Sequence, residues 1–289
     1  MRDFAQSDNP EVQAQLDRLA ALTLPQGRLG LETIRDLLAR LGNPQRRLPP
    51  TFHVAGTNGK GSTCAYLRAM LEAQGLIVHS AIKPHLVRYN ERIRIAGELV
   101  SDAELASLLA EVLDLGEALG PSFFEVTTAA TFLAFARHPA DACIIEVGLG
   151  GRLDATNVLV DPLVTGVAQL GMDHEAFLGD SLPVIAGEKA GIAKLGRPLV
   201  TQDYAATLNI VVVETARLAG AVHCPRGGDW EGRVEADRLH YRDAAGVLDL
   251  PLPALAGQRQ ADNAALAVAI LRHQDRLAVS PEAMARGLM

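Results

Sequence analysis

Short apolar runs alternate along the chain with longer segments whose apolar residues recur at helical spacing. We expect buried strands at 51–55, 76–80, 141–147 and 163–167. We expect helices at about 62–74, 102–119, 124–138, 181–193 and 261–273. Ser101 precedes the second helix as an N-cap, and Pro183 lies in the first turn of the fourth, where proline is tolerated. This alternation predicts an α/β fold with a mostly parallel sheet flanked by helices.

The pattern changes after Gly220, where short strand-like runs replace the longer elements. Runs at 233–236, 238–242 and 247–250 predict a small β subregion at about 220–252. Ser280, Pro281 and Glu282 then supply an N-cap, a first-turn proline and an acidic first turn. They open a helix shortly before Met289. Because a domain seldom ends there, we expect a chain that lacks a following domain.

The amino-acid composition limits the kinds of binding partner that we expect for this protein. The 27 lysines and arginines stand against 34 aspartates and glutamates, a formal net charge of −7 at pH 7. This balance gives no reason to expect nucleic acid or an anionic membrane as a partner. Cys64, Cys143 and Cys224 are too widely spaced to indicate a disulfide framework or a CxxC metal site. No signal-peptide core or membrane-length apolar stretch occurs, so we expect a cytoplasmic protein.

A glycine-rich turn between the first predicted strand and the first predicted helix is the sharpest chemical feature. Its glycines let backbone N–H groups point at phosphate oxygens, and Lys60 can neutralise the β- and γ-phosphates. Ser62 or Thr63 would face a phosphate-bound Mg²⁺. A strict Walker A pattern fails, because Val54 stands at its first glycine and Gly61 follows the lysine. We prefer a phosphate loop to a turn with an exposed lysine. Its predicted ATP-binding residues are Gly56, Thr57, Asn58, Gly59, Lys60, Gly61 and Ser62.

Two polar residues follow predicted strands on the side where parallel α/β sheets bind ligands. Glu146 stands near the end of the run at 141–147, where a carboxylate is well placed for Mg²⁺. The alternative is that Glu146 caps the next turn or pairs with Arg152. His174 follows the strand at 163–167 after a short loop. A lone histidine is more often structural than a ligand, and Mg²⁺ prefers oxygen donors.

The loop sequence Gly-Thr-Asn-Gly-Lys-Gly-Ser at 56–62 resembles that of the Mur-ligase superfamily. Blocks similar to the folate branch of that superfamily lie at 31–45, 84–94, 123–128, 146–157, 188–194 and 260–265. They follow in the family's order, which argues against chance similarity. The chain therefore resembles bifunctional dihydrofolate synthase/folylpolyglutamate synthase. The resemblance implies a Mur-ligase-like ATP-binding domain over 1–289, without the family's C-terminal ligase domain.

An ATP-dependent ligase is the activity that the resemblance implies. Such enzymes phosphorylate a substrate carboxylate with ATP, and the amine of L-glutamate attacks the acyl phosphate to give an amide, ADP and phosphate. The implied cofactors are ATP and one or two Mg²⁺, with Ser62, Glu146 and His174 as metal ligands. Catalytic roles would fall to Lys60, His174 and Lys189.

Two of the implied roles compete with plainer interpretations. The resemblance implies that Lys189 is carbamylated to N6-carboxylysine, which requires a neutral amine and hence a lowered pKa. The pattern alone favours a solvated helix lysine paired with Glu188 or Asp180. Asn263 would contact the adenine side of ATP, although a polar residue early in a helix needs no such role.

For the pteroate-type substrate the resemblance points to two predicted loops and one arginine. These residues are Ser122, Phe123, Phe124, Glu125, Leu153, Asp154, Ala155 and Arg88. Phe124 would stack on the pterin with Asp154 as a polar partner, although a buried phenylalanine is ordinarily plain core. Arg88, Arg92 and Arg94 would receive an anionic substrate tail, or strand alternation would simply expose them.

One substitution departs from the family's pattern. Lys83 stands where the family has a serine whose hydroxyl binds Mg²⁺, and an ammonium cannot bind a metal ion. Lys83 therefore turns away, supplies the missing charge itself, or impairs the site. Since we also expect the C-terminal domain to be missing, we expect nucleotide binding with weak or no ligase turnover.

Three functions follow from these observations. The first is a folate ligase represented by its ATPase domain, a monomer whose partners are ATP, folate or dihydropteroate, and L-glutamate. The second is a non-catalytic ATP- or pterin-binding relative, and the third is another Mur-type amino-acid ligase. A P-loop GTPase or kinase is disfavoured, because no Walker-type GK[ST] motif is evident.

Overall fold

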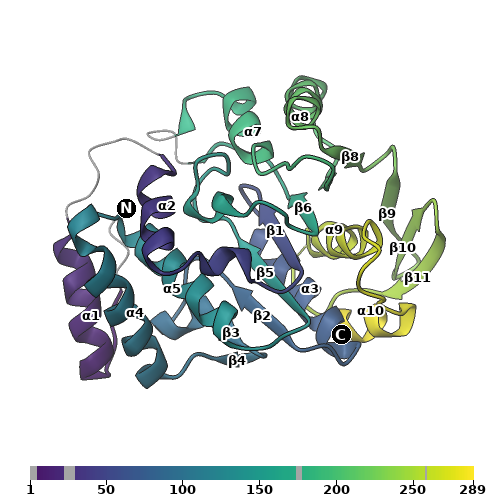
Figure 1. The fold of residues 1–289 in the computed structure, drawn as a ribbon. Helices are drawn as coiled ribbons and strands as arrows, with labels where there is room; N and C mark the ends of the chain where they lie inside the picture. Colours follow the sequence, from purple (N-terminus) through teal and green to yellow (C-terminus); the bar gives the residue numbers. More distant parts are fainter. Residues whose placement is uncertain (1–4, 23–29, 174–177, 258) are drawn as a thin grey trace.

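The computed structural model describes residues 5–22, 30–173, 178–257 and 259–289, whose arrangement is shown in Figure 1. Its main sheet has eight strands in the order β4-β3-β2-β5-β1-β6-β7-β8. These strands are β1 (Thr51–Ala55), β2 (Val78–Ala81), β3 (Ile93–Ile95), β4 (Glu98–Leu99), β5 (Ala142–Glu146), β6 (Val164–Val167), β7 (Pro198–Thr201) and β8 (Val222–Pro225). The neighbouring strands β2, β5, β1, β6, β7 and β8 run parallel to one another. Strands β3 and β4 form an antiparallel edge beside β2. The predicted fold class is confirmed.

Helices cover both faces of this sheet. The α-helices are α1 (Pro10–Ala21), α2 (Glu32–Arg40), α3 (Lys60–Ala73), α4 (Asp102–Gly116), α5 (Phe123–Arg137), α7 (Leu182–Ala190), α8 (Ala206–Ala219), α9 (Gln260–Arg272) and α10 (Pro281–Leu288). Short 3₁₀ turns lie at η1 (Pro44–Arg46), η2 (Tyr89–Arg92), η3 (Glu117–Leu119) and η4 (Ala155–Val158). Ala142 and Ile144 of β5 pack with α3 and α9, while Cys143 and Ile145 pack with α4 and α5. A parallel strand buried on both faces reads as a continuous apolar run, which is why the strand at 141–147 was predictable.

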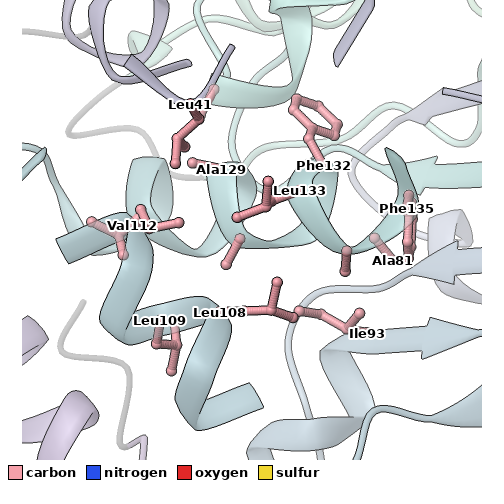
Figure 2. Close-up of a cluster of buried hydrophobic side chains, with 14 of the residues drawn as sticks. Leu41, Ala81, Ile93, Leu108, Leu109, Val112, Ala129, Phe132, Leu133 and Phe135 are labelled. Atoms are coloured by element: carbon pink, nitrogen blue, oxygen red, sulfur yellow. The ribbon is translucent and has the colours of Figure 1, made fainter. Parts of the chain in front are cut away.

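Figure 2 shows the core between the sheet and the layer of α4 and α5. Its labelled members are Leu41, Ala81, Ile93, Leu108, Leu109, Val112, Ala129, Phe132, Leu133 and Phe135. The Ser101 side chain accepts a hydrogen bond from the backbone N–H of Glu104, so the predicted N-cap of α4 is confirmed. Phe132 is fully buried, and truncating such a ring to alanine costs about 3–5 kcal/mol. This packing fixes the position of α5, whose first turns border the end of β2.

A second, three-stranded antiparallel sheet packs on α9. Its strands are β9 (Trp230–Glu235), β10 (Arg238–Asp243) and β11 (Gly246–Pro251), in the predicted small β subregion. Trp230 and Tyr241 stack with ring centroids 6.1 Å apart. Asp243 receives two hydrogen bonds, of 2.5 and 2.6 Å, from the guanidinium of Arg272 at the end of α9. The small sheet is thereby fixed to the helix that carries Asn263.

Some element boundaries differ from the predicted ones, and several weakly patterned elements were not predicted. The strand at 51–55 is confirmed with its predicted bounds, whereas α3 begins at Lys60, two residues before the predicted 62. The helix opened by Ser280 forms over Pro281–Leu288, with the Ser280 side chain accepting from the N–H of Ala283. The sequence pattern predicted no element for α1, α2, β3, β4, β7, α8 or β8. Among the described residues, no helix is long and apolar enough to cross a membrane.

Candidate active site

The glycine-rich turn lies between β1 and α3, at the carboxyl edge of the parallel strands. Gly59 is the N-cap of α3 with φ +84°, a left-handed conformation that disfavours any side chain. A Cβ on Gly59 would also lie 2.2 Å from Asn263 Oδ1. No side chain caps α3, so its first N–H groups and the positive end of its dipole are available to an anion.

The segment that follows β6 holds this turn in place. The backbone N–H of Thr57 donates to the Gln169 carbonyl at 2.7 Å. The Thr57 hydroxyl donates to the Gly171 carbonyl at 2.9 Å, and the Gly171 N–H donates back to that hydroxyl at 3.1 Å. Because backbone and side chain are both bonded, the turn is ordered before any phosphate arrives. His174, three residues beyond Gly171, lies outside the described residues.

Two ammonium groups converge on one carbonyl of the turn. Lys60 Nζ donates to the carbonyls of Gly56 and Thr57 at 2.8 and 3.0 Å, and Lys189 Nζ donates to the Gly56 carbonyl at 3.1 Å. Lys189 is 1% exposed, with Asp173 3.6 Å from its Nζ. Burial and then the nearby Lys60 charge lower the pKa of Lys189 to about 8, although Asp173 opposes the shift.

The plainer interpretations of Lys189 and Glu146 involved partners that the structure places elsewhere. Glu188 accepts two hydrogen bonds from Arg152, at 2.9 and 2.7 Å. Arg152 is thus engaged on the outer side of α7 and does not serve as the partner of Glu146. Lys189 points inward from the last turn of α7 to the glycine-rich turn at 56–62, here termed the phosphate turn. It is therefore not a solvated helix lysine.

Glu146 ends β5 and faces the N-terminus of α3. It is 3% exposed, and its Oε2 accepts from the backbone N–H of Lys83 at 3.1 Å. A Cβ on Gly61 would lie 3.8 Å from the same oxygen. Burial raises the pKa of Glu146 to about 7, against the opposing effects of the Lys83 N–H and the Lys60 and Lys83 charges.

The residues around Glu146 fit a magnesium ion bound together with phosphates. Within the described ranges, no three His, Cys, Asp or Glu side chains gather into a metal cluster. Mg²⁺ ordinarily takes one or two protein oxygens and completes its shell with phosphate and water. The Glu146 carboxylate is a hard oxygen donor beside the phosphate turn, and Ser62 Oγ lies near the start of α3, where it accepts from Gln260 Nε2 at 3.2 Å.

Lys83 turns its side chain away from the phosphate turn. Its Nζ donates to Thr128 Oγ1 at 3.3 Å, and its stem crosses Gly148, where a Cβ would meet Lys83 Cδ at 3.0 Å. Burial lowers the pKa of Lys83, while the charges of Asp154 and Glu146 act in the opposite direction. The ammonium therefore lies on the substrate side of the predicted site, near Thr128 and Asp154, while the Lys83 backbone N–H binds Glu146.

Asp154 is saturated by donors from its own loop. Its Oδ2 accepts from the N–H groups of Gly148 and Leu149 at 3.1 and 2.9 Å. Its Oδ1 accepts from the N–H and hydroxyl of Thr156 at 2.9 and 2.5 Å. Burial alone would raise the pKa of Asp154, but the Lys83 charge and these donors lower it. A carboxylate has about four acceptor sites, so these four hydrogen bonds use all of them. The main role of Asp154 is therefore to hold its own loop in place.

The predicted substrate residues divide into packed and open ones. Phe124 is 38% exposed, whereas the Phe123 ring packs edge-on against Tyr89, with centroids 6.0 Å apart. Ser122 and Glu125 form a reciprocal capping box, with Glu125 Oε2 2.7 Å from the Ser122 N–H and the Ser122 hydroxyl 3.3 Å from the Glu125 N–H. Of these four residues, Phe124 offers an open ring face to a ligand.

The remaining predicted residues lie at the margins of the site. Arg88 is 60% exposed and pairs with Asp102 at 3.2 Å, whereas Arg92 is buried and donates to His85 Nδ1 at 2.9 Å. The three arginines of that segment therefore do not form one exposed cluster. Leu153 and Ala155 flank Asp154 as half-buried and buried apolar contacts. Asn263 is 4% exposed in the first turn of α9, against Gly59.

Comparison with known proteins settles the family. No family model matches the chain. It is 37% identical over 275 residues to dihydrofolate synthase/folylpolyglutamate synthase of Bacillus subtilis, a match that covers 90% of this chain and 64% of the relative. Its fold matches E. coli FolC in complex with DHPP and ADP, with a TM-score of 0.89, 37% identity, and 96% and 65% of the two chains covered. The apo form of L. casei FPGS matches with a TM-score of 0.86 and 31% identity over 96% of this chain and 71% of that one. The chain belongs to this family.

As a member of the dihydrofolate synthase/folylpolyglutamate synthase family, the chain spans only part of its relatives' length, 64% and 60% of the Bacillus subtilis and E. coli proteins. Its site also contains residues to which the sequence pattern gave no role. Asp173 is the carboxylate beside Lys189, and Gln260 bonds Ser62 from the start of α9. The position of Asp173 directly before His174 was the available signal, whereas nothing local to Gln260 indicated a contact with a segment 198 residues away.

Proposed function

We propose that this chain is the ATP-binding part of a ligase that adds L-glutamate to dihydropteroate or (tetrahydro)folate through an acyl phosphate. The supporting relatives are named as synthases of this kind. Solved relatives are complexes with DHPP and ADP, with AMPPCP and folate, and with Mn, AMPPNP and L-glutamate. We further propose a monomeric cytoplasmic protein, with 1–289 as one ATP-binding domain and 220–252 as its β subregion.

One observation carries the proposal: a helix N-terminus without a side-chain cap, the Lys60 ammonium and a buried carboxylate lie together at the carboxyl ends of neighbouring strands. Among the described residues, Lys60 bonds only to carbonyls of its own turn, at 2.8 and 3.0 Å, so a phosphate can bind its ammonium without breaking an ion pair to any of them. Glu146 faces the same helix end from β5. Cations around a transferring phosphoryl group and fixed backbone dipoles are what phosphoryl transfer requires.

The proposed reaction divides among residues that the structure brings together. The N–H groups of α3 and Lys60 hold the triphosphate, and a substrate carboxylate oxygen attacks the γ-phosphorus while ADP leaves. The glutamate amine then attacks the acyl carbon, losing a proton as phosphate departs. Mg²⁺ held by Ser62 and Glu146 would supply charge neutralisation for the phosphates. The open face of Phe124 would stack on the pterin and align the carboxylate.

Lys189 has the environment that carbamylation by CO₂ requires. A pKa of about 8 leaves about a tenth of the amine neutral at pH 7, far more than in an ordinary lysine. The N6-carboxylysine product would replace one of the two ammonium groups at the Gly56 carbonyl with an anion. Repulsion from Lys60 would then become attraction, while the attraction to Asp173 would become repulsion, so the lowered pKa is the main support for modification at this lysine.

Calorimetric titration tests the nucleotide part of the proposal. We expect Mg·ATP to bind the native chain and to lose about tenfold or more in affinity in Lys60→Met, since one phosphate-directed charge is removed. Lys194→Met is the matched control, because Lys194 is a half-buried lysine whose ammonium bonds Asn157 and does not reach the phosphate turn. Equal ATP affinity in Lys60→Met and the native chain would contradict the assignment.

Titration with dihydropteroate and a phosphate-release assay then separate a ligase from a binding relative. We expect the pteroate-type ligand to bind the ATP-loaded chain and glutamate-dependent phosphate release to be slow. Release as fast as in the full-length Bacillus subtilis relative would refute the expected weak turnover. Glutamate-dependent release above background would identify a ligase, whereas absent release with intact binding of both ligands is the result that a non-catalytic relative predicts.

A further inference from the structure

His53 is a polar residue in the middle of β1, the strand that leads into the phosphate turn. It is fully buried, and its neighbours Phe52 and Val54 are buried apolar side chains. In the register of the sheet it lies opposite Ile145 of β5 and Thr165 of β6. An apolar side chain would suit such a central position without any polar group to desolvate. Packing alone therefore does not explain a histidine here.

One ring nitrogen of His53 has a partner, and the other has none within the described ranges. Nε2 lies 2.8 Å from the Thr156 hydroxyl oxygen, whereas Nδ1 is buried without a hydrogen bond to any described residue. The Thr156 hydroxyl donates to Asp154 Oδ1 at 2.5 Å, so its own proton is already committed. Burial lowers the pKa of His53 to about 3, although the Asp154 charge acts in the opposite direction. The ring is therefore neutral, and its proton lies on Nε2, where it is donated to Thr156.

The result is a directed chain of hydrogen bonds from the central strand to the segment 148–156, here termed the Asp154 loop. His53 donates to Thr156, and Thr156 donates to Asp154. The carboxylate also accepts from the N–H groups of Gly148 and Leu149, where the loop begins. A buried nitrogen without a partner is unfavourable, so a histidine at this position indicates a use for the donor at Nε2.

The Asp154 loop and the phosphate turn belong to the two halves of the proposed site. Leu153 and Ala155, two of the proposed substrate contacts, lie in this loop, and the phosphate turn begins at Gly56, three residues after His53. A substrate carboxylate must come within reacting distance of the γ-phosphate, so the two segments need a fixed separation. The hydrogen bond from β1 to Thr156 joins them directly.

We propose that His53 is a positioning residue for the pteroate-type substrate, which acts by donating from Nε2 to Thr156 and so holds the Asp154 loop in register with the phosphate turn. The inference rests on the proposed function and adds a residue to it. A histidine that only filled space in the core would affect stability and both ligands alike. A positioning histidine affects the substrate selectively, and its role is retained by any side chain that places a donor at the same point.

Three substitutions of His53 separate these two roles. The amide nitrogen of His53→Gln stands as many bonds from Cβ as Nε2 does and can donate to Thr156. The amide of His53→Asn reaches only the place of Nδ1, and His53→Leu has no donor. Dihydropteroate is titrated into the full chain loaded with AMPPNP. We expect the affinity to fall about tenfold or more in His53→Asn and His53→Leu, and to stay within about threefold of the native value in His53→Gln. We expect AMPPNP affinity to change by less than about threefold in all three.

Thr156→Val provides a second route if a His53 variant does not fold. It keeps the shape of the side chain and removes the hydroxyl, so we expect a similar selective loss of dihydropteroate affinity, and Thr156→Ser should restore it. The double variant His53→Leu/Thr156→Val should lose no more than the single variants, because both act through one chain of hydrogen bonds.

Several results would overturn the inference. These are equal losses in His53→Gln and His53→Leu, parallel losses of AMPPNP and dihydropteroate, undiminished dihydropteroate affinity in Thr156→Val, or additive losses in the double variant. A native chain that binds AMPPNP but not dihydropteroate would instead overturn the proposed substrate, and this inference with it.

Discussion

Replacing Lys189 by methionine is expected to stabilise the protein near neutral pH. The lysine is 1% exposed and shares the Gly56 carbonyl with Lys60, so its ammonium is buried beside another positive charge. Methionine has a similar stem and no charge, and the Gly56 carbonyl retains its hydrogen bond from Lys60. The change therefore removes an unfavourable charge without leaving that acceptor empty.

The magnitude follows from the pKa. Folding lowers the pKa of Lys189 from 10.5 to about 8, which corresponds to about 3 kcal/mol at pH values below 8. In that range both folded and unfolded chains carry the proton, and the full cost is present. Between pH 8 and 10.5 the folded amine is neutral while the unfolded one is still charged, so the cost declines as pH rises. Above 10.5 it is absent. The advantage of Lys189→Met should follow the same course.

Urea unfolding at a series of pH values from about 7 to 10, in CO₂-free buffer, measures this difference. Lys189→Arg is the control, because an arginine stays charged throughout and should gain nothing as pH rises. Bicarbonate should stabilise the native chain and leave Lys189→Met unaffected, since a carbamate forms on lysine alone. A stability difference that is independent of pH, or a destabilised methionine variant at pH 7, would refute the reasoning.

Three further predictions concern other parts of the chain. Gly59→Ala should abolish ATP binding in calorimetry, because the left-handed backbone and the contact with Asn263 both exclude a Cβ; undiminished affinity would show that the turn does not hold phosphate. Phe124→Ala should weaken binding of the pteroate-type ligand about tenfold while changing urea stability by less than about 1 kcal/mol, since the ring is 38% exposed. Asp243→Asn should cost about 3 kcal/mol or more of unfolding free energy by stranding the charge of Arg272; an unchanged urea midpoint would contradict this.

The sequence predicted the central strands better than the flanking elements. The fully buried runs that became β1 and β5 are short, apolar and bounded by turns, which leaves few alternatives. Helix α8 was not predicted, because its run of β-branched residues at 211–213 has the composition of a strand. Packing against α7 and a left-handed Gly220 at its C-cap decide in favour of a helix.

The candidate site was predictable in outline, because the carboxyl ends of parallel strands must meet at one edge of the sheet. The sequence pattern could not predict the direction in which each side chain points. It did not indicate that Lys60 and Lys189 share a carbonyl, or that Asp154 is saturated by its own loop. These features depend on contacts between residues far apart in sequence, whose geometry is set only by the folded backbone.

The close packing of α10 on α3 links the last helix of the chain to the phosphate turn. A Cβ on Gly287 would lie 2.5 Å from the backbone nitrogen of Met70, so the two helices touch backbone to backbone. Arg286 adds a hydrogen bond to the Ala73 carbonyl at 2.7 Å, where α3 ends. Since a helix transmits displacement along its axis with little bending, we expect a probe attached beside Met289 to respond to nucleotide at the opposite end of α3. The C-terminus is thus a natural position for a fluorescent reporter of ATP binding.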